Sequence, residues 1–199
     1  MKLETIILAA GSSSRMGKDK ALLQVNGISV IKTIIDKVSP FSSKVIIIAG
    51  ENYSQLKTEY DVIYNEQWQK GMFSSLQKGL AASSANCWLM LHLIDHPFIK
   101  PETYSEMIQA IDEKYLVIKP FLKKEKKSGH PLLLSSEIRD ILLSASPDSI
   151  LKNVLHSLPA EKILRIAVAD EGIIDNLNTY EDFQQRIKKK RRRRVLNRG

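Results

Sequence analysis

A glycine- and serine-rich segment near the start of the chain carries the residue types that bind a polyphosphate. Residues 8–20 read LAAGSSSRMGKDK, directly after a run of apolar residues. Gly11 and the serines that follow let backbone N–H groups approach a ligand closely. Arg15 and Lys20 add fixed cations that neutralise phosphate oxygens. The segment lacks the Gly-Lys-Ser/Thr ending of a P-loop and the Gly-x-Gly-x-x-Gly dinucleotide fingerprint. It therefore predicts a phosphate-binding loop of another kind, with a solvated turn as the alternative.

A second candidate is Asp95, which directly follows the apolar segment 88–94. A carboxylate in this position is a suitable oxygen ligand for Mg²⁺, which bridges the phosphates of a nucleoside triphosphate during transfer. The same position, shortly before Pro97, also suits a helix N-cap. The residue alone leaves both interpretations open.

Apolar segments with strand and helix periodicity alternate along the chain. This alternation predicts an α/β fold with a mostly parallel central sheet covered on both faces. In such sheets ligands bind beyond the carboxyl ends of the strands, where both the loop after Leu8 and Asp95 would lie. The expected strands are 5–9, 44–50, 61–64, 88–94, 116–120, 131–134 and 163–169. The expected helices are 30–38, 74–82, one opening at Pro101, 136–143, 149–156 and 180–186.

The net charge of +8 comes from the end of the chain. Residues 188–199 hold eight lysines and arginines and no acid, so the rest of the chain has 22 charges of each sign. We expect one domain over 1–187 and a basic, disordered tail over 188–199; the tail could also be vector-derived or an arm for nucleic acid. No apolar run is long enough for a bilayer span, and the start lacks signal-peptide features. A cytoplasmic location is the default expectation.

Five segments together resemble the molybdenum cofactor nucleotidyltransferases, most closely the molybdopterin cytidylyltransferases. Residues 8–20 resemble the family's opening signature, and 65–80 (NEQWQKGMFSSLQKGL) resemble its Asn-x-x-Trp-x-x-Gly-Met-x-x-Ser-Leu-x-x-Gly segment. Residues 95–99 (DHPFI), 129–131 (GHP) and 176–182 (NLNTYED) resemble its metal-binding, acceptor-side and closing segments. The resemblance implies a three-layer, Rossmann-like nucleotide-diphospho-sugar transferase fold of the glycosyltransferase-A type. It also implies Mg²⁺-dependent transfer of a nucleoside monophosphate to the phosphate of molybdopterin, with release of pyrophosphate.

The resemblance assigns roles to individual residues. Those implied in catalysis are Arg15, Lys20 and Asp95. Those implied in nucleotide binding are Leu8, Ala9, Ala10, Gly11, Ser12, Arg15, Lys20, Ser75 and Gly79. Asp95 and Asn178 are the implied ligands of Mg²⁺, although Asn178 could instead cap a helix and Asp175 could replace it. His96 and His130 are the implied acceptor contacts, and each could equally be a packed or solvent-facing histidine.

The identity of both substrates remains a prediction. In the family a Leu-Ala-Ala-Gly opening accompanies CTP, and the Cβ of Ala10 would narrow the base site against a purine, so we expect CTP. Relatives usually have Gly where this chain has Ile94, and Pro where it has Tyr180. Both departures concern the identity of the acceptor. The nearest alternative is a sugar- or alcohol-phosphate cytidylyl-, uridylyl- or guanylyltransferase. An alternative of another class is a non-catalytic relative that binds nucleic acid or delivers the cofactor to a partner molybdoenzyme.

Overall fold

The computed structural model describes residues 2–11, 19–177, 179–181, 183, 184 and 186. Ser12, Arg15, Asn178 and the tail 188–199 lie outside the described residues. The strands are β1 (Leu3–Leu8), β2 (Gln24–Val25), β3 (Ile28–Ser29), β4 (Lys44–Ala49), β5 (Val62–Tyr64), β6 (Trp88–Leu93), β7 (Val117–Leu122), β8 (Lys127–Ser128), β9 (Leu132–Leu134) and β10 (Ile163–Ala167). The α-helices are α1 (Val30–Val38), α2 (Tyr53–Leu56), α3 (Met72–Ala82), α4 (Pro101–Gln109), α5 (Arg139–Ser144) and α6 (Leu151–His156). Short 3₁₀ turns cover Ser39–Phe41, Trp68–Lys70, Ser136–Ile138, Ala160–Lys162 and Glu171–Ile173.

The central sheet has the strand order β10-β7-β9-β6-β1-β4-β5, with β8 paired to the edge of β7. β1 lies in the middle and pairs in parallel with β4 and β6. The pairs β4–β5 and β7–β10 are also parallel. Only β9 among the strands of the main path runs the other way, antiparallel to β6 and β7. The predicted mostly parallel sheet is therefore confirmed.

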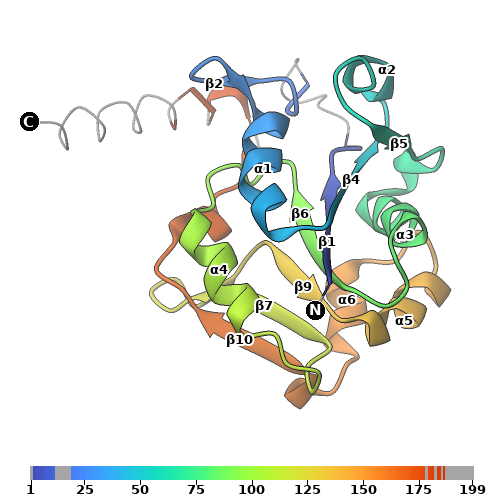
Figure 1. Ribbon diagram of the computed structural model, residues 1–199, viewed down its shortest axis with the longest axis vertical. Coiled ribbons are helices and arrows are strands. Elements are labelled where there is room, and N and C mark those ends of the chain that lie inside the picture. Colours follow the sequence, from blue (N-terminus) through green and yellow to red (C-terminus); the bar gives the residue numbers. More distant parts are fainter. Residues whose placement is uncertain (1, 12–18, 178, 182, 185, 187–199) are drawn as a thin grey trace, which may run out of the picture.

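Helices cover both faces of this sheet (Figure 1). α1 and α4 pack on one face, where their apolar side chains join one buried cluster with residues of β1, β4 and β6. α3, α5 and α6 pack on the other face in a second cluster. All six residues of β1 are buried, which explains why its sequence lacks the apolar-polar alternation of a half-exposed strand. The three-layer arrangement is thus confirmed.

Local signals fix the ends of the covering helices. Ser29 caps α1, accepting a hydrogen bond from the Lys32 backbone N–H at 3.3 Å. Pro101 occupies the first turn of α4, with Glu102 beside it, where a negative charge suits the helix dipole.

None of the helices within the described part of the chain is long and apolar enough to cross a bilayer.

Glu4 is a buried carboxylate in β1 that is well supplied with donors. It accepts hydrogen bonds from the Ser84 N–H (3.0 Å) and hydroxyl (2.6 Å) and pairs with Lys2 at 2.8 Å. Burial alone would raise the pKa of Glu4, but the bonds from Lys2 and Ser84 together outweigh it and lower the pKa from 4.5 to about 2. Glu4 should therefore stabilise the fold most at neutral pH.

We expect Glu4→Gln to lower the free energy of unfolding at pH 7 by about 2 to 3 kcal/mol. The folded-state pKa is depressed, so this contribution is present above pH 4.5 and is lost as the pH falls toward 2. Urea denaturation of both proteins at pH 7 and pH 3 checks this. The difference between them should shrink by more than half at pH 3, and an equal difference at both pH values would contradict the assignment.

Candidate functional site

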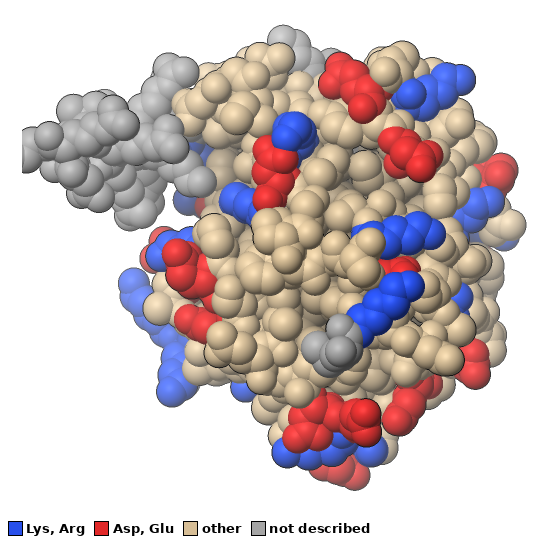
Figure 2. All heavy atoms as spheres, in the orientation of Figure 1, with Lys and Arg blue, Asp and Glu red and all other residues tan. Residues whose placement is uncertain are grey.

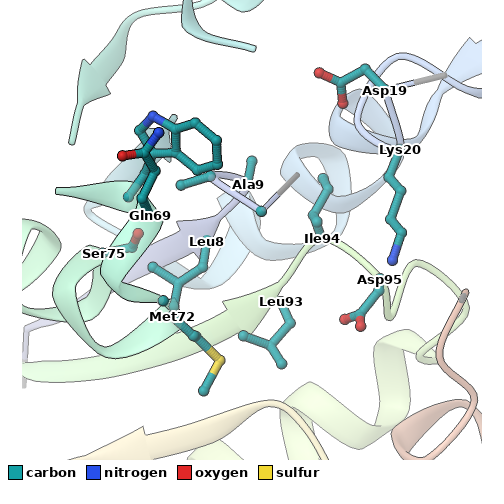
Figure 3. A pocket seen from close by; sticks show the side chains of 14 residues that line it. Leu8, Ala9, Asp19, Lys20, Gln69, Met72, Ser75, Leu93, Ile94 and Asp95 are labelled. Atoms are coloured by element: carbon teal, nitrogen blue, oxygen red, sulfur yellow. The ribbon is translucent and has the colours of Figure 1, made fainter. Parts of the chain in front are cut away.

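A cavity of about 350 Å³ opens at the carboxyl ends of β1 and β6. The loop after β1, the residues before the β2–β3 hairpin, the start of α3 and the loop after β6 all contribute to it (Figure 3). Its lining residues are Leu8, Ala9, Ala10, Gly11, Asp19, Lys20, Trp68, Gln69, Gly71, Met72, Ser75, Leu93, Ile94 and Asp95. Seven of the residues predicted from the sequence, namely Leu8, Ala9, Ala10, Gly11, Lys20, Ser75 and Asp95, are thus brought together.

Backbone hydrogen bonds and one buried amide hold the end of β1 in place. The Ala9 N–H donates to the Ile48 carbonyl at 2.9 Å, which keeps the chain in register with β4 beyond the strand. The Asn52 side chain donates to the Ala9 carbonyl at 3.0 Å and accepts from the Gly50 N–H at 3.3 Å. A Cβ on Gly50 would lie 2.5 Å from the Ala10 carbonyl oxygen, so only glycine lets the two strand ends approach this closely.

Asp19 is a site residue that the sequence interpretation missed. Its Oδ1 accepts a hydrogen bond from the Ala21 N–H at 2.8 Å, forming a local turn around Lys20. Burial raises the pKa of the Asp19 carboxyl, opposed by hydrogen bonds from Ala21 and Asn52. Figure 3 shows that the neighbouring Lys20 side chain extends toward Asp95. Asp19 and Asn52 therefore act as positioning residues that connect Lys20 to the end of β1.

The start of α3 forms the opposite wall of the cavity. Asn65 lies buried behind it and donates hydrogen bonds to the Ser74 and Ser75 hydroxyls at 3.0 and 2.9 Å. This fixes the Ser75 hydroxyl where it lines the cavity. Gly79, which was expected to shape the nucleotide pocket, lies one turn further on, where a Cβ would stand 2.6 Å from a methyl group of Ile6. The structure places Gly79 in the contact between α3 and β1, outside the cavity wall.

Asp95 lies at the floor of the cavity with one oxygen that lacks a donor. Its Oδ1 is buried, and within the described ranges of the chain no group donates a hydrogen bond to it. His96 Nε2 lies 3.6 Å from this oxygen, beyond hydrogen-bond distance. A buried carboxylate oxygen without a donor is costly unless a cation completes its coordination. This observation fits a hard divalent cation and does not fit a helix N-cap.

Two side chains, Lys37 and Asp170, hold the loop that carries Asp95. Lys37 of α1 donates to the carbonyls of Pro97 and Ile99 at 2.6 and 2.7 Å. The buried carboxylate of Asp170 accepts from the Lys100 N–H (2.7 Å), the Thr103 hydroxyl (2.8 Å) and the Gly172 N–H (2.9 Å). Lys37 thus attaches the loop to α1, and Asp170 attaches the start of α4 to the C-terminal segment.

The C-terminal segment passes directly beside the proposed metal ligand. The Leu177 N–H donates to the Asp95 carbonyl at 2.8 Å. The next residue, Asn178, is the second ligand predicted from the sequence and lies outside the described residues. Asp175 pairs with Arg186 at 2.6 Å and so already has a cationic partner. This pairing makes Asp175 a less suitable substitute ligand.

The histidines near the site differ in burial and in contacts: His92 and His96 are buried, and His130 is partly exposed. His92 in β6 bonds to the Leu93 carbonyl and to the Tyr104 hydroxyl, each at 2.9 Å, and burial lowers its pKa to about 3. It is a structural residue. The rings of His96 and His130 lie with their centroids 5.3 Å apart. This contact brings together the loop after β6 and the loop before β9, which the sequence predicts to face the acceptor. Desolvation by the groups packed around the ring, with a smaller effect of His96, lowers the pKa of His130 to about 3, so its ring is neutral at physiological pH.

Ile94, noted in the sequence as a departure, also lines the cavity. Its backbone N–H donates to the Leu8 carbonyl at 3.1 Å, so the backbone at this position continues the pairing of β6 with β1. The side chain packs partly against the core and partly along the cavity wall next to Asp95. The Ile94 side chain, which is larger than the glycine usual in relatives, is thus accommodated while Asp95 still lines the cavity.

Comparisons with known proteins agree with this arrangement. The family model described as "MobA-like NTP transferase domain" matches residues 5–163. The molybdenum cofactor guanylyltransferase of Vibrio cholerae is 32% identical over 108 residues, which cover 53% of this chain and 53% of that protein. The chain thus matches about half the length of that relative. The molybdenum cofactor cytidylyltransferase of Escherichia coli is 24% identical over 187 residues, covering 91% of this chain and 93% of that protein.

Solved structures with the same fold support the architecture. Rv0371c from Mycobacterium tuberculosis superposes with a TM-score of 0.80 at 20% identity, covering 94% of this chain and 97% of that one. The same protein in complex with manganese gives a TM-score of 0.77 at 20% identity, covering 94% of this chain and 99% of that one. At this identity the similarity establishes the fold, which is the Rossmann-like nucleotide-diphospho-sugar transferase fold.

Proposed function

Because the chain belongs to the MobA-like NTP transferase family, we propose that it transfers CMP from CTP to the phosphate of molybdopterin and releases pyrophosphate. The observation that carries the proposal is the single cavity that combines the turn after β1, the Lys20 ammonium and the Asp95 carboxylate. This combination supplies donors and a cation for a triphosphate and an oxygen ligand for the divalent metal that accompanies it. The names of the two relatives above support transfer to the molybdenum cofactor.

The turn after β1 suits close contact with phosphate oxygens. The N–H groups of Ala10 and Gly11 donate to no other residue in the described part of the chain. A Cβ on Gly11 would meet no described protein atom within 4 Å. Packing among the described residues, which exclude 12–18, therefore gives no reason for a glycine there, whereas a phosphate seated against the backbone does.

Asp95 would hold Mg²⁺ through its donorless oxygen, with Asn178 as the second ligand proposed from the sequence. A bound Mg²⁺ would neutralise the charge that otherwise opposes the approach of an anionic acceptor. The manganese in the related Mycobacterium tuberculosis structure supports a divalent cation in this fold. Lys20, and Arg15 from the sequence, would stabilise the charge that develops on the departing pyrophosphate.

The reaction is an in-line displacement. An oxygen of the acceptor phosphate forms a bond to the α-phosphorus of CTP as the bond between that phosphorus and the bridging oxygen breaks. Pyrophosphate leaves with the electron pair, so no covalent intermediate on the protein is needed. Positioning and electrostatic neutralisation supply the catalysis.

The choice of CTP rests on the wall that faces the base. Ala10 lines the cavity, is buried and belongs to the core cluster on the α3 face, and we propose that its methyl group narrows the base site against a purine. Trp68, Gln69 and Ser75 form the remaining wall on the α3 side. We therefore expect the smaller pyrimidine base to be preferred.

The proposal is tested by incubating the protein and Mg²⁺ with each of the four common NTPs, with and without molybdopterin, and measuring pyrophosphate. We expect release with CTP and molybdopterin together, and at least about tenfold less with GTP, since a size-based pocket separates bases by about 1–3 kcal/mol. Release with sugar or alcohol phosphates in place of molybdopterin would identify the alternative acceptor class. Absence of release with every pair would contradict the proposed activity.

A further inference from the structure

A second, smaller cavity of about 200 Å³ lies on the face of the sheet covered by α6. We call it the basic cavity because lysine and histidine side chains gather on an apolar wall. Its lining residues are Met72, Lys119, Ser128, Gly129, His130, Leu132, Leu151, Lys152, Leu155 and His156. None of these described lining residues is acidic.

The basic cavity adjoins the nucleotide cavity at two places. Met72, at the start of α3, lines both. His130 lines the basic cavity, and its ring lies 5.3 Å from that of His96, the residue next to Asp95. A molecule whose phosphate approached the proposed metal could therefore extend past Met72 and His130 into the basic cavity.

Lys119 is the cation that the fold fixes most firmly there. It stands in β7 and is half-buried, with its backbone paired to Arg165 of the neighbouring parallel strand β10. Burial lowers the pKa of Lys119, and the nearby positive charge of Arg165 adds to this effect. Lys152, which is exposed on α6, adds a second ammonium group at the rim. A cation surrounded by other cations and apolar side chains is stabilised when an anion joins it.

We propose that the basic cavity binds the part of the acceptor that lies beyond its reacting phosphate, and that Lys119 is a specificity-determining residue for an acceptor with a flat ring and a second anionic group. The proposal rests on the proposed function of the adjoining cavity. The ring would pack on Leu132, Leu151 and Leu155, while the Lys119 ammonium donates to the anionic group. Acceptors without such a group would bind less tightly.

Two fluorescent pterins test the cavity without any transfer reaction. Pterin-6-carboxylate carries a ring and an anion, and 6-hydroxymethylpterin carries the same ring without charge. We expect Lys119→Met to weaken binding of the carboxylate about tenfold or more, while the uncharged pterin binds unchanged. Lys119→Arg should restore part of the loss. Lys123→Met removes an exposed lysine just beyond β7 and serves as the matched control.

Kinetics with CTP and molybdopterin provide the second readout. Lys119→Met should raise KM for molybdopterin about tenfold and leave KM for CTP near the wild-type value. One outcome separates the two proposals: no acceptor supports transfer, and Lys119→Met no longer binds pterin-6-carboxylate more tightly than 6-hydroxymethylpterin. In that case the proposed function fails and the cavity assignment stands. Equal binding of both pterins to wild type and Lys119→Met would overturn the inference. If Lys119→Met does not fold, Lys152→Met is measured instead and should weaken binding of pterin-6-carboxylate to a smaller degree. An unchanged preference of Lys152→Met for the carboxylate over the uncharged pterin would then overturn the inference.

Discussion

Replacing Asp95 by alanine should lower kcat/KM for nucleotidyl transfer by at least about 100-fold, the usual cost of removing a preorganised electrostatic contact. Asp95→Asn should lose nearly as much, because the amide keeps the size of the side chain and removes its charge. Pyrophosphate release over a Mg²⁺ titration measures both. The activity that remains should require a higher Mg²⁺ concentration for half-saturation.

The stability of the same variants separates a metal ligand from a structural residue. Oδ1 of Asp95 is buried without a donor in the described residues, and only the backbone carbonyl of Asp95 holds Leu177. Asp95→Ala should therefore unfold in metal-free buffer at the same urea concentration as wild type or a higher one. Asp140→Ala, on the exposed side of α5, is the control for loss of a carboxylate. Full activity in Asp95→Ala, or marked destabilisation, would contradict the assigned role.

Lys20→Met should reduce kcat/KM for CTP by about 100- to 1000-fold. The Lys20 side chain lines the nucleotide cavity and extends toward Asp95, so its charge would lie next to the triphosphate in both the bound and the reacting state (Figure 3). KM for CTP should rise as kcat falls. Steady-state kinetics at saturating Mg²⁺ measures the two constants separately.

Lys20→Arg distinguishes charge from geometry. Arginine keeps the positive charge but presents it as a planar fork, so we expect partial recovery only. Lys123→Met should retain wild-type kinetics. A Lys20→Met variant with unchanged kcat/KM would show that the triphosphate binds elsewhere. The kcat/KM of Asp19→Ala should lie between those of wild type and Lys20→Met, because the Asp19 carboxylate acts by holding the turn that carries Lys20.

Much of the fold could be predicted because the central strands β1 and β6 are buried on both faces. β1, β4 and β6 are predominantly apolar, and the residues expected to carry chemistry follow the carboxyl ends of β1 and β6. Parallel pairing of these three strands then places the loop after Leu8 and Asp95 at one edge. The balanced charge outside the tail also agrees with the surface, where acidic and basic side chains alternate over the visible face (Figure 2).

Other features depended on contacts distant in the sequence. The antiparallel direction of β9 follows from how residues 123–131 turn back, which three leucines in a row do not encode. The β2–β3 hairpin was missed although Asn26-Gly27 is a strong signal; both residues adopt positive φ, at 54° and 83°. Asp19 and Asn52 are far apart in sequence and meet only when the ends of β1 and β4 come together. Gly79 was assigned to the ligand, whereas the close approach of α3 to Ile6 accounts for it.

The placement of the cation and the triphosphate is tested most directly by a crystal structure with Mn²⁺ and a non-hydrolysable CTP analogue. Anomalous scattering locates Mn²⁺ independently of the nucleotide. We predict a manganese peak at the Asp95 carboxylate, with the triphosphate against Ala10 and Gly11 and within reach of Lys20. A triphosphate bound away from the end of β1, or a manganese peak with no contact to Asp95, would contradict the account.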